Sequence, residues 1–178
     1  LAILPGSDTA MGLAEHLSAS LQLPFSNDPR MATQRLHKAR MQEALLDAGI
    51  PALRTISSAS EAEVEVWLRE KELAGAPLVV KPANSAGSDK VFLIPENGDW
   101  RKALQRVLTE PSKLDGKNHD TAIVQEQAIG TEFAIGTVSS NGKHYIAQII
   151  QYTKGRAGNR SVVYDYVEFI PFNEEVHG

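Results

Sequence analysis

Lys81 is the first residue of the chain whose surroundings suggest chemistry. It ends the apolar run Leu78–Lys81 and is followed at once by the small, polar segment 82–89. Small residues let backbone N–H groups approach an anion closely, and a neighbouring ammonium group adds a fixed positive charge. The segment therefore suits a polyphosphate, and a plain hairpin turn with a lysine at its rim fits it equally well.

Two carboxylates at the margins of a short link are the next candidates. Glu126 ends one apolar run, Glu132 begins the next, and Gly130 lies between them. The free backbone N–H and C=O groups of such a link can bind the edge of an adenine, while a carboxylate can accept hydrogen bonds from both hydroxyls of a ribose. Glutamate is also common at solvated strand margins, and these residues alone favour that plainer interpretation.

Lys38 belongs to a segment with helical spacing. Apolar residues at positions 36, 41, 45 and 48 predict one helix from Thr33 to Ala48, which Gly49 and Pro51 end. A lysine within such a helix is usually solvated. Periodicity alone therefore places Lys38 at the surface.

The remaining patterns predict a mixture of helices and antiparallel strands, hence an α+β fold without βαβ alternation. In the first part of the chain the expected elements are a strand tail over residues 1–4, a helix with Leu13, Leu17 and Leu21 as its apolar stripe, and a helix opened by a capping box of Ser60 and Glu63. A hairpin of strands 78–81 and 91–94 and a helix over 99–110 follow. The last part is expected to hold strands over 122–127, 132–139 and 143–152, a basic loop over 153–161, and a last strand over 162–170. Asn141-Gly142 is a strong hairpin signal between two of these strands.

The bulk composition excludes several classes of protein. A formal net charge of −4 gives no support for a general nucleic-acid or membrane-surface binder. The chain has no cysteine, which excludes disulfides, thiolate catalysis and cysteine-ligated zinc. No apolar stretch approaches the roughly 20 residues that span a bilayer, and no signal peptide opens the chain. We therefore expect a cytoplasmic protein without a nucleic-acid or membrane partner.

Both ends of the chain suggest a piece of a longer protein. The opening run Leu1–Pro5 is typical of the end of a buried strand that has no start, and His177-Gly178 follows no closing element. Motifs that are absent here can lie outside these residues.

Three short motifs, in order, resemble those of the ATP-grasp superfamily. They are Arg35–Met41 running into Ala48–Pro51, then Pro77–Pro82, then Gln125-Glu126 together with Gly130–Phe133. Within the superfamily the chain is most similar to carboxylate–amine ligases that join amino acids, and its segment 81–88 resembles the phosphate loop of bacterial L-amino acid ligases of the dipeptide-antibiotic type. The resemblance covers residue 31 to the end.

This resemblance implies an α+β ATP-grasp fold, with two α+β subdomains and the nucleotide cleft between them, incomplete at both ends. We expect residues 1–30 to be the end of the preceding (pre-ATP-grasp) domain, residues 31–124 the small subdomain, and residues 125–178 the start of the large subdomain.

For the triphosphate, the resemblance implies two lysines and a loop. Lys81 matches the lysine that contacts the α- and β-phosphates, and Lys38 matches the second nucleotide lysine. Ser85, Gly87 and Ser88 match the flexible loop that folds over the phosphates.

For the rest of the nucleotide, the resemblance implies a second set of residues. Gln125 takes the position whose side chain faces the adenine amino group, while Glu126 and Ala128 match the backbone acceptor and donor for adenine. Glu132 matches the carboxylate that binds the ribose. Lys154, in the basic loop, is matched loosely to a lysine near the γ-phosphate, and it is the one candidate catalytic residue.

Two departures from the family pattern matter. Many relatives have Gly-Val after the phosphate loop, whereas Lys90 precedes Val91 here, which predicts a stiffer or differently shaped loop. The family takes its magnesium ligands from strands beyond the end of this chain. The late acidic residues do not fit that spacing and are interpreted as surface charges, so no metal ligand is assigned in this chain; they are Asp165, Glu168, Glu174 and Glu175.

The implied function is an ATP- and Mg²⁺-dependent ligase that joins a small carboxylate, expected to be an amino acid, to an amine through an acyl-phosphate. This chain alone is expected to be inactive, and a homodimer is one compatible assembly. Two alternatives stay open: another ATP-grasp chemistry, such as carboxylation or purine-precursor ligation, and a non-catalytic nucleotide-binding module. A P-loop or Rossmann enzyme is disfavoured, because neither glycine fingerprint occurs.

Overall fold

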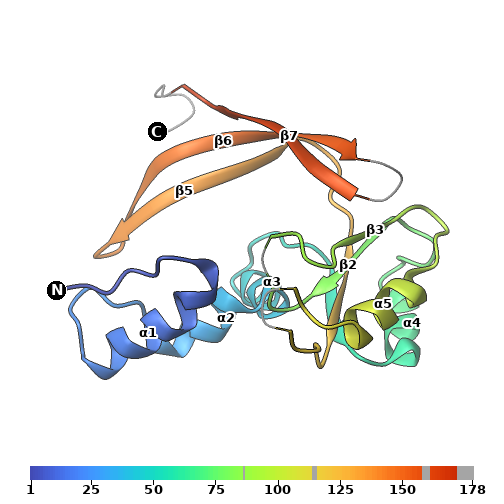
Figure 1. Ribbon diagram of the computed structural model, residues 1–178, viewed down its shortest axis with the longest axis horizontal. Coiled ribbons are helices and arrows are strands. Elements are labelled where there is room, and N and C mark those ends of the chain that lie inside the picture. The colour runs from blue at the N-terminus through green and yellow to red at the C-terminus, as the bar shows by residue number, and fades with distance from the viewer. Residues whose placement is uncertain (86, 114–115, 158–160, 172–178) are drawn as a thin grey trace. The chain divides into compact units, whose positions relative to one another are not determined.

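Two units make up the chain in the computed structural model, which describes residues 1–85, 87–113, 116–157 and 161–171 (Figure 1). The first unit is Leu1–Gln127 and the second is Ala128–Gly178. The sequence-based boundaries, including the assignment of residues 1–30 to a preceding domain, stay predictions.

The elements confirm the predicted α+β class. In the first unit they are the 3₁₀-helices Asp8–Ala10 and Pro29–Met31, the helices α1 (Met11–Ser20), α2 (Ala32–Leu36), α3 (Lys38–Asp47), α4 (Glu61–Glu70) and α5 (Trp100–Thr109), and the strands β1 (Thr55–Ser58), β2 (Leu78–Pro82), β3 (Phe92–Ile94) and β4 (Ala122–Glu126). The second unit holds β5 (Glu132–Ser140), β6 (Lys143–Ala157) and β7 (Ser161–Phe169). No helix of the described residues is long and apolar enough to cross a lipid bilayer.

The sheet of the first unit is antiparallel, with strand order β1-β4-β2-β3. The predicted β2–β3 hairpin is confirmed by the pairing of Val80 with Phe92. Because alternate side chains of a strand point to opposite faces, β2 presents Leu78 and Val80 to one face and Lys81 to the other. The sheet therefore has an apolar face and a face that carries polar groups.

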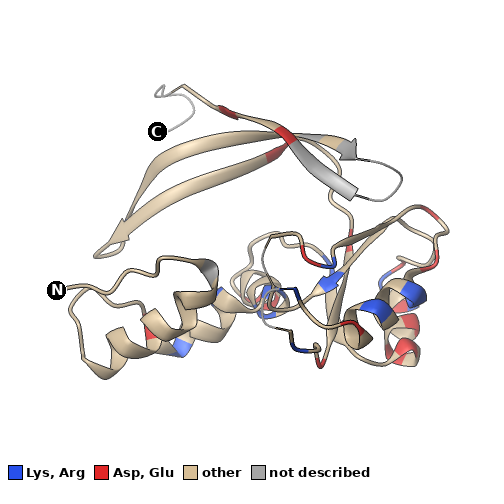
Figure 2. Cartoon of the chain, viewed as in Figure 1, with Lys and Arg blue, Asp and Glu red and all other residues tan. Residues whose placement is uncertain are grey.

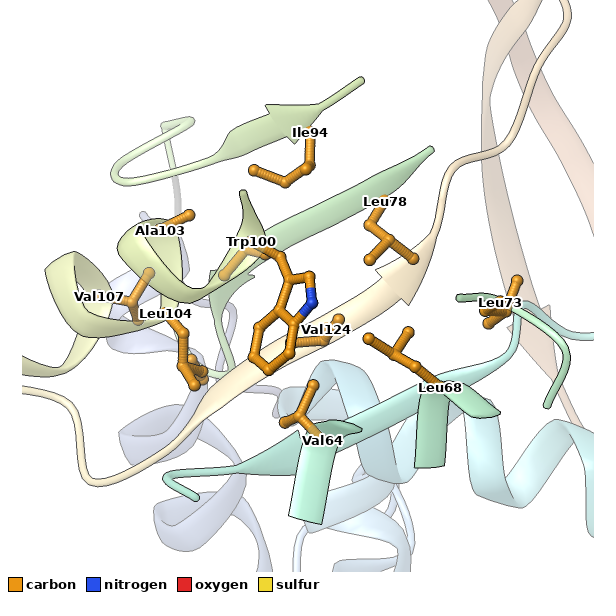
Figure 3. Packing of buried hydrophobic residues seen from close by; sticks show 12 residues of the cluster. Val64, Leu68, Leu73, Leu78, Ile94, Trp100, Ala103, Leu104, Val107 and Val124 are labelled. Atoms are coloured by element: carbon orange, nitrogen blue, oxygen red, sulfur yellow. The ribbon is translucent and has the colours of Figure 1, made fainter. Parts of the chain in front are cut away.

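The apolar face is covered by α4 and α5 and forms the main core of the unit (Figure 3). The Trp100 ring lies among aliphatic side chains of both helices and of the sheet, and Leu104 is 0% exposed. Both helices carry charged residues (Figure 2). Arg101 of α5 pairs with Glu61 and Glu65 of α4. Exposed ion pairs of this kind stabilise little, so burial holds the helices in place.

The other face of the sheet is covered by α3. Ala39 of α3, Ile123 of β4 and Ala83, which follows β2, form a second buried cluster. The small Ala39 side chain lets the start of α3 approach the sheet closely. This contact brings the N-terminus of α3 to the end of β2, where Lys81 lies.

The sheet of the second unit is a simple meander with strand order β5-β6-β7. The hairpin predicted at Asn141-Gly142 is confirmed, since both residues have positive φ, 51° and 76°, as a tight primed turn requires. The predicted basic loop over 153–161 is wrong for residues 153–157, which continue β6, and for Ser161, which begins β7; residues 158–160 lie outside the described residues. The backbone of β6 stays paired with β7, with Lys154 opposite Tyr164 and Ala157 opposite Ser161, and this pairing outweighs the weak strand preference of the segment.

The N-terminal segment also differs from the prediction. Residues 1–4 form no strand in the structure, and Leu1 is 90% exposed, because no neighbouring strand pairs with this segment. In α1 the buried residues are the small Ala14 and Ser18, while the leucines of the predicted apolar stripe are exposed. The strand β1 was not predicted at all, because its four residues, Thr55–Ser58, are too few to show a period.

Leu104→Ala is expected to lower the free energy of unfolding by about 2–5 kcal/mol, because it removes a fully buried side chain and leaves a cavity in the α4–α5 core. Urea denaturation followed by circular dichroism measures the change. Leu46→Ala is the control: Leu46 is 55% exposed on α3 and should cost less than about 1 kcal/mol. Equal losses for the two variants would contradict the assigned core.

Candidate functional site

A break between two helices sets the position of Lys38. The single helix predicted over 33–48 is wrong: α2 ends at Leu36, α3 begins at Lys38, and His37 between them has extended backbone (φ −110°, ψ 114°). The His37 Nδ1 atom caps α3 by accepting from the Arg40 N–H at 3.4 Å. The Lys38 N–H donates instead to the Ala83 carbonyl at 3.3 Å. The break therefore ties the start of α3 to the loop after β2.

The Lys38 side chain points into that loop. Its Nζ donates to the Ser85 carbonyl oxygen at 2.6 Å, and the residue is half-buried. Helical periodicity alone placed Lys38 at the surface, which is wrong, because periodicity cannot show what packs beside the first turn of a helix.

Lys81 lies on the face of the sheet that α3 covers. Its Nζ donates to Gln125 Oε1 at 2.8 Å, and among the described residues Lys81 makes no ion pair. Burial lowers the pKa of Lys81, and the positive charge of Lys38 lowers it further. The two predicted phosphate lysines are thus close enough to act on each other, although they are far apart in sequence.

Gln125 is buried, with 4% of its surface exposed, and both ends of its amide are bonded. Its Oε1 accepts from Lys81, and its Nε2 donates to Thr55 Oγ1 at 2.8 Å. The predicted contact of this side chain with an adenine amino group stays a prediction. The link to Thr55 of β1 was missed, because neither residue type nor spacing marks it in the sequence.

Glu126 is held by Arg54, the residue just before β1. The Arg54 N–H donates to Oε1 and the guanidinium Nε to Oε2, both at 2.7 Å, while Glu126 N–H donates to the Arg54 carbonyl at 3.0 Å. Burial raises the pKa of Glu126, but the hydrogen bonds and charge of Arg54 outweigh it and leave the pKa below its usual value. The end of β4, where the predicted backbone contacts to adenine begin, is therefore fixed to the start of β1.

The loop after β2 carries the other predicted phosphate ligands. The Ser85 hydroxyl is buried and has no hydrogen-bond partner among the described residues. Gly87 and Ser88 are exposed and have positive φ, 63° and 58°, a conformation that turns backbone N–H groups outward in a short run. Both features suit a loop that binds an anion.

The far end of this loop is tethered. Asp89, 7% exposed, accepts from Ser112 Oγ at 3.2 Å and from Lys113 N–H at 3.1 Å. Lys90 donates from Nζ to the Glu110 carbonyl and has a φ of 52°. Glycine favours this conformation, whereas lysine adopts it at a cost of about 1–2 kcal/mol. The expectation of a stiffer or differently shaped loop stays a prediction.

The other predicted ligands belong to the second unit. Ala128 is exposed, and Glu132 begins β5 opposite Tyr152. Lys154 lies within β6, but its side chain falls outside the described part of the structure. The contacts above thus join Lys38, Lys81 and Gln125 with the Ser85 loop. They do not include Ala128, Glu132 or Lys154.

No metal centre can be built from the described residues, since none of them form a group of three or more His, Asp or Glu side chains able to hold an ion. Asp165 and Glu168 are exposed on β7, and Glu174 and Glu175 lie outside the described residues.

Comparison with known proteins identifies the family. Residues 74–168, more than half of the chain, match the model of the ATP-grasp domain. The chain belongs to the ATP-grasp family. It is also 31% identical over 153 residues to dapdiamide A synthase from Enterobacter agglomerans. This alignment covers 86% of the chain but 35% of the relative's length.

Solved structures of ATP-grasp ligases confirm the fold. The L-amino acid ligase from Bacillus licheniformis superimposes with a TM-score of 0.64 at 18% identity, covering 98% of this chain and 38% of that one. The D-alanine–D-alanine ligase from Coxiella burnetii also gives 0.64 at 18% identity, covering 84% of this chain and 42% of that one. The expected α+β ATP-grasp fold is therefore confirmed, and the chain corresponds to part of each enzyme.

The stability of the protein is expected to fall below pH 6.5 through His37. Burial lowers the pKa of His37 most, and the positive charge of Arg40 lowers it further. The pKa of His37 in the folded protein therefore lies below the ordinary 6.5. Above pH 6.5 the His37 imidazole is neutral in both the folded and the unfolded protein. As the pH falls, the unfolded protein takes up the proton first, so the free energy of unfolding decreases until the pH passes the pKa of His37 in the folded protein. Urea denaturation between about pH 5 and pH 8 measures this loss.

His37→Asn is the matched control, because asparagine can cap α3 without titrating. As the pH falls, the free energy of unfolding of the native protein should decrease more than that of this variant. Parallel curves over the whole range would exclude His37 as the titrating cap.

Proposed function

We propose that this chain is the ATP-binding part of a ligase that joins the carboxylate of a small molecule, an amino acid in the simplest case, to an amine. ATP would phosphorylate the carboxylate, giving an acyl-phosphate and ADP. The amine would then displace phosphate and form an amide. Dapdiamide A synthase and the L-amino acid ligase, to which the chain is similar, support this reaction class.

One observation carries the nucleotide-binding part of the proposal. Lys38 and Lys81, from separate elements, lie near the loop after β2, where the buried Ser85 hydroxyl has no hydrogen-bond partner among the described residues. A triphosphate would offer anionic acceptors to the two ammonium groups and to this hydroxyl. Their positions are held by the sheet and by α3, so little ordering is required on binding.

We assign the predicted residues to ATP as follows. Lys81 would contact the α- and β-phosphates, Lys38 would add the second positive charge, and the loop of Ser85, Gly87 and Ser88 would donate to the phosphates. Gln125 would face the adenine amino group, the backbone of Glu126 and Ala128 would bind the adenine edge, Glu132 would bind the ribose, and Lys154 would approach the γ-phosphate. Lys38 and Lys81 would also neutralise charge on the transferring phosphoryl group.

Magnesium is part of the proposal but has no ligands assigned in this chain. When bound, it would neutralise the charge that develops on the transferring phosphoryl group. The described residues offer no cluster for it, so every role assigned above concerns the nucleotide alone.

Lys81→Met is expected to weaken ATP binding at least tenfold, because a charge-assisted phosphate contact contributes roughly 1.5–3 kcal/mol. Isothermal titration calorimetry measures the affinity. Lys102→Met, which removes an exposed lysine of α5, is the control and should bind like the native protein. An unchanged affinity for Lys81→Met, with native ATP binding intact, would remove Lys81 from the phosphate site.

The reaction class is tested by incubating the protein that carries this sequence with ATP, magnesium and pairs of amino acids. We expect ADP and phosphate to be released in equal amounts, only when a carboxylate and an amine donor are both present, and a dipeptide mass to appear. Release of AMP and pyrophosphate, or no dependence on any amino acid, would contradict the proposed ligase.

A further inference from the structure

A chain of hydrogen bonds runs across the polar face of the sheet and ends on Lys81. Lys81 Nζ donates to Gln125 Oε1 at 2.8 Å, and Gln125 Nε2 donates to Thr55 Oγ1 at 2.8 Å. The Thr55 hydroxyl donates to the Leu53 carbonyl at 2.9 Å. Three strands and the segment before β1 are thus connected by side chains as well as by the backbone ladder.

The direction of every bond in this chain is determined by its two ends. An ammonium group can only donate, and a backbone carbonyl can only accept. The Thr55 hydroxyl must therefore donate to Leu53 and accept from Gln125, so the NH₂ group of Gln125 faces Thr55. Its carbonyl oxygen is left facing Lys81, which is the orientation that an ammonium group needs.

The far end of the chain is anchored independently. The Leu53 N–H donates to Gln42 Oε1 of α3 at 2.9 Å, which ties the backbone of Leu53 to α3. Thr55 lies directly opposite Gln125 in the β1–β4 register, and Val79 lies opposite Gln125 on the other side. Lys81, two residues after Val79, is therefore the diagonal neighbour that Gln125 can reach.

We propose that Thr55 is a positioning residue for Lys81: by accepting from the Gln125 amide, it holds the Gln125 carbonyl against the Lys81 ammonium and so aims that group at its ligand. The consequence for nucleotide binding rests on the proposed function. The hydrogen-bond chain itself does not.

Without the Thr55 hydroxyl, the buried NH₂ group of Gln125 would lose its acceptor. The amide would then be free to turn, and an NH₂ group facing Lys81 would repel the ammonium. Lys38 of α3 is the charge that acts on Lys81, whereas Gln125 of β4 and Thr55 of β1 are uncharged. Burial and the Lys38 charge lower the pKa of Lys81. The hydrogen bond to the Gln125 carbonyl acts in the opposite direction, because it stabilises the protonated ammonium group.

The first test needs no nucleotide. The titration of Lys81, followed by NMR of its ε-methylene group, should move to lower pH in Thr55→Val and stay native in Thr55→Ser, which keeps the hydroxyl. Thr121→Val is the matched control, since it removes a hydroxyl that bonds to Ser57 Oγ on the same sheet at 3.0 Å but has no part in this chain. An unshifted Lys81 titration in folded Thr55→Val would overturn the proposal.

The second test is a double-mutant cycle on ATP binding. Thr55→Val should weaken binding by about fivefold or more in the native background and should have no further effect when Lys81 is already methionine. A purely structural loss would instead add to that of Lys81→Met, and additive losses would overturn the proposal. If the native protein binds no ATP, the proposed function fails while the Lys81 titration still decides the role of Thr55.

Thr55→Val could also prevent folding, in which case Gln125→Met replaces it. This variant removes the acceptor itself and should lower the Lys81 titration in the same way, with a native-like circular dichroism spectrum as the check on folding. A native Lys81 titration in Gln125→Met would exclude any role of the hydrogen-bond chain.

Discussion

The antiparallel pairing of β2 with β4 is the constraint on which both the core and the site depend. This register places Val80 beside Val124 on the apolar face. The next residue of each strand points to the other face, where Lys81 bonds to Gln125. A slip by one residue would turn all of these side chains to the wrong face. The burial of aliphatic groups under α4 and α5 therefore also determines where the site lysine points.

The electrostatics of the site follow from this register and from the break at His37. The break starts α3 at Lys38, so that its ammonium lies over the loop after β2 and acts on Lys81. Two positive charges held together by packing are unfavourable for the protein alone and favourable for a polyanion. A site of this kind is arranged before its ligand arrives, as ATP-grasp chemistry on a triphosphate would require.

Successive side chains of β4 point to opposite faces, and both are bonded to the segment around β1. Gln125 reaches Thr55, and Glu126 reaches Arg54. The short strand β1 carries no recognisable motif, yet it orients the polar ends of the central strand. Under the proposed function, such a strand would support the nucleotide contacts of the sheet without making them.

The sequence by itself determined the α+β class, the hairpin at Asn141-Gly142, the helix that begins at Trp100, and the family to which the chain belongs, because local propensity and short motifs depend on neighbouring residues. The tertiary structure decided that the helix breaks at His37, that Lys38 is half-buried, and that Thr55 lies behind Lys81. These features arise from contacts between residues distant in sequence. Such contacts leave no period or spacing in the chain, since packing and hydrogen bonding across the sheet create them only once the fold is complete.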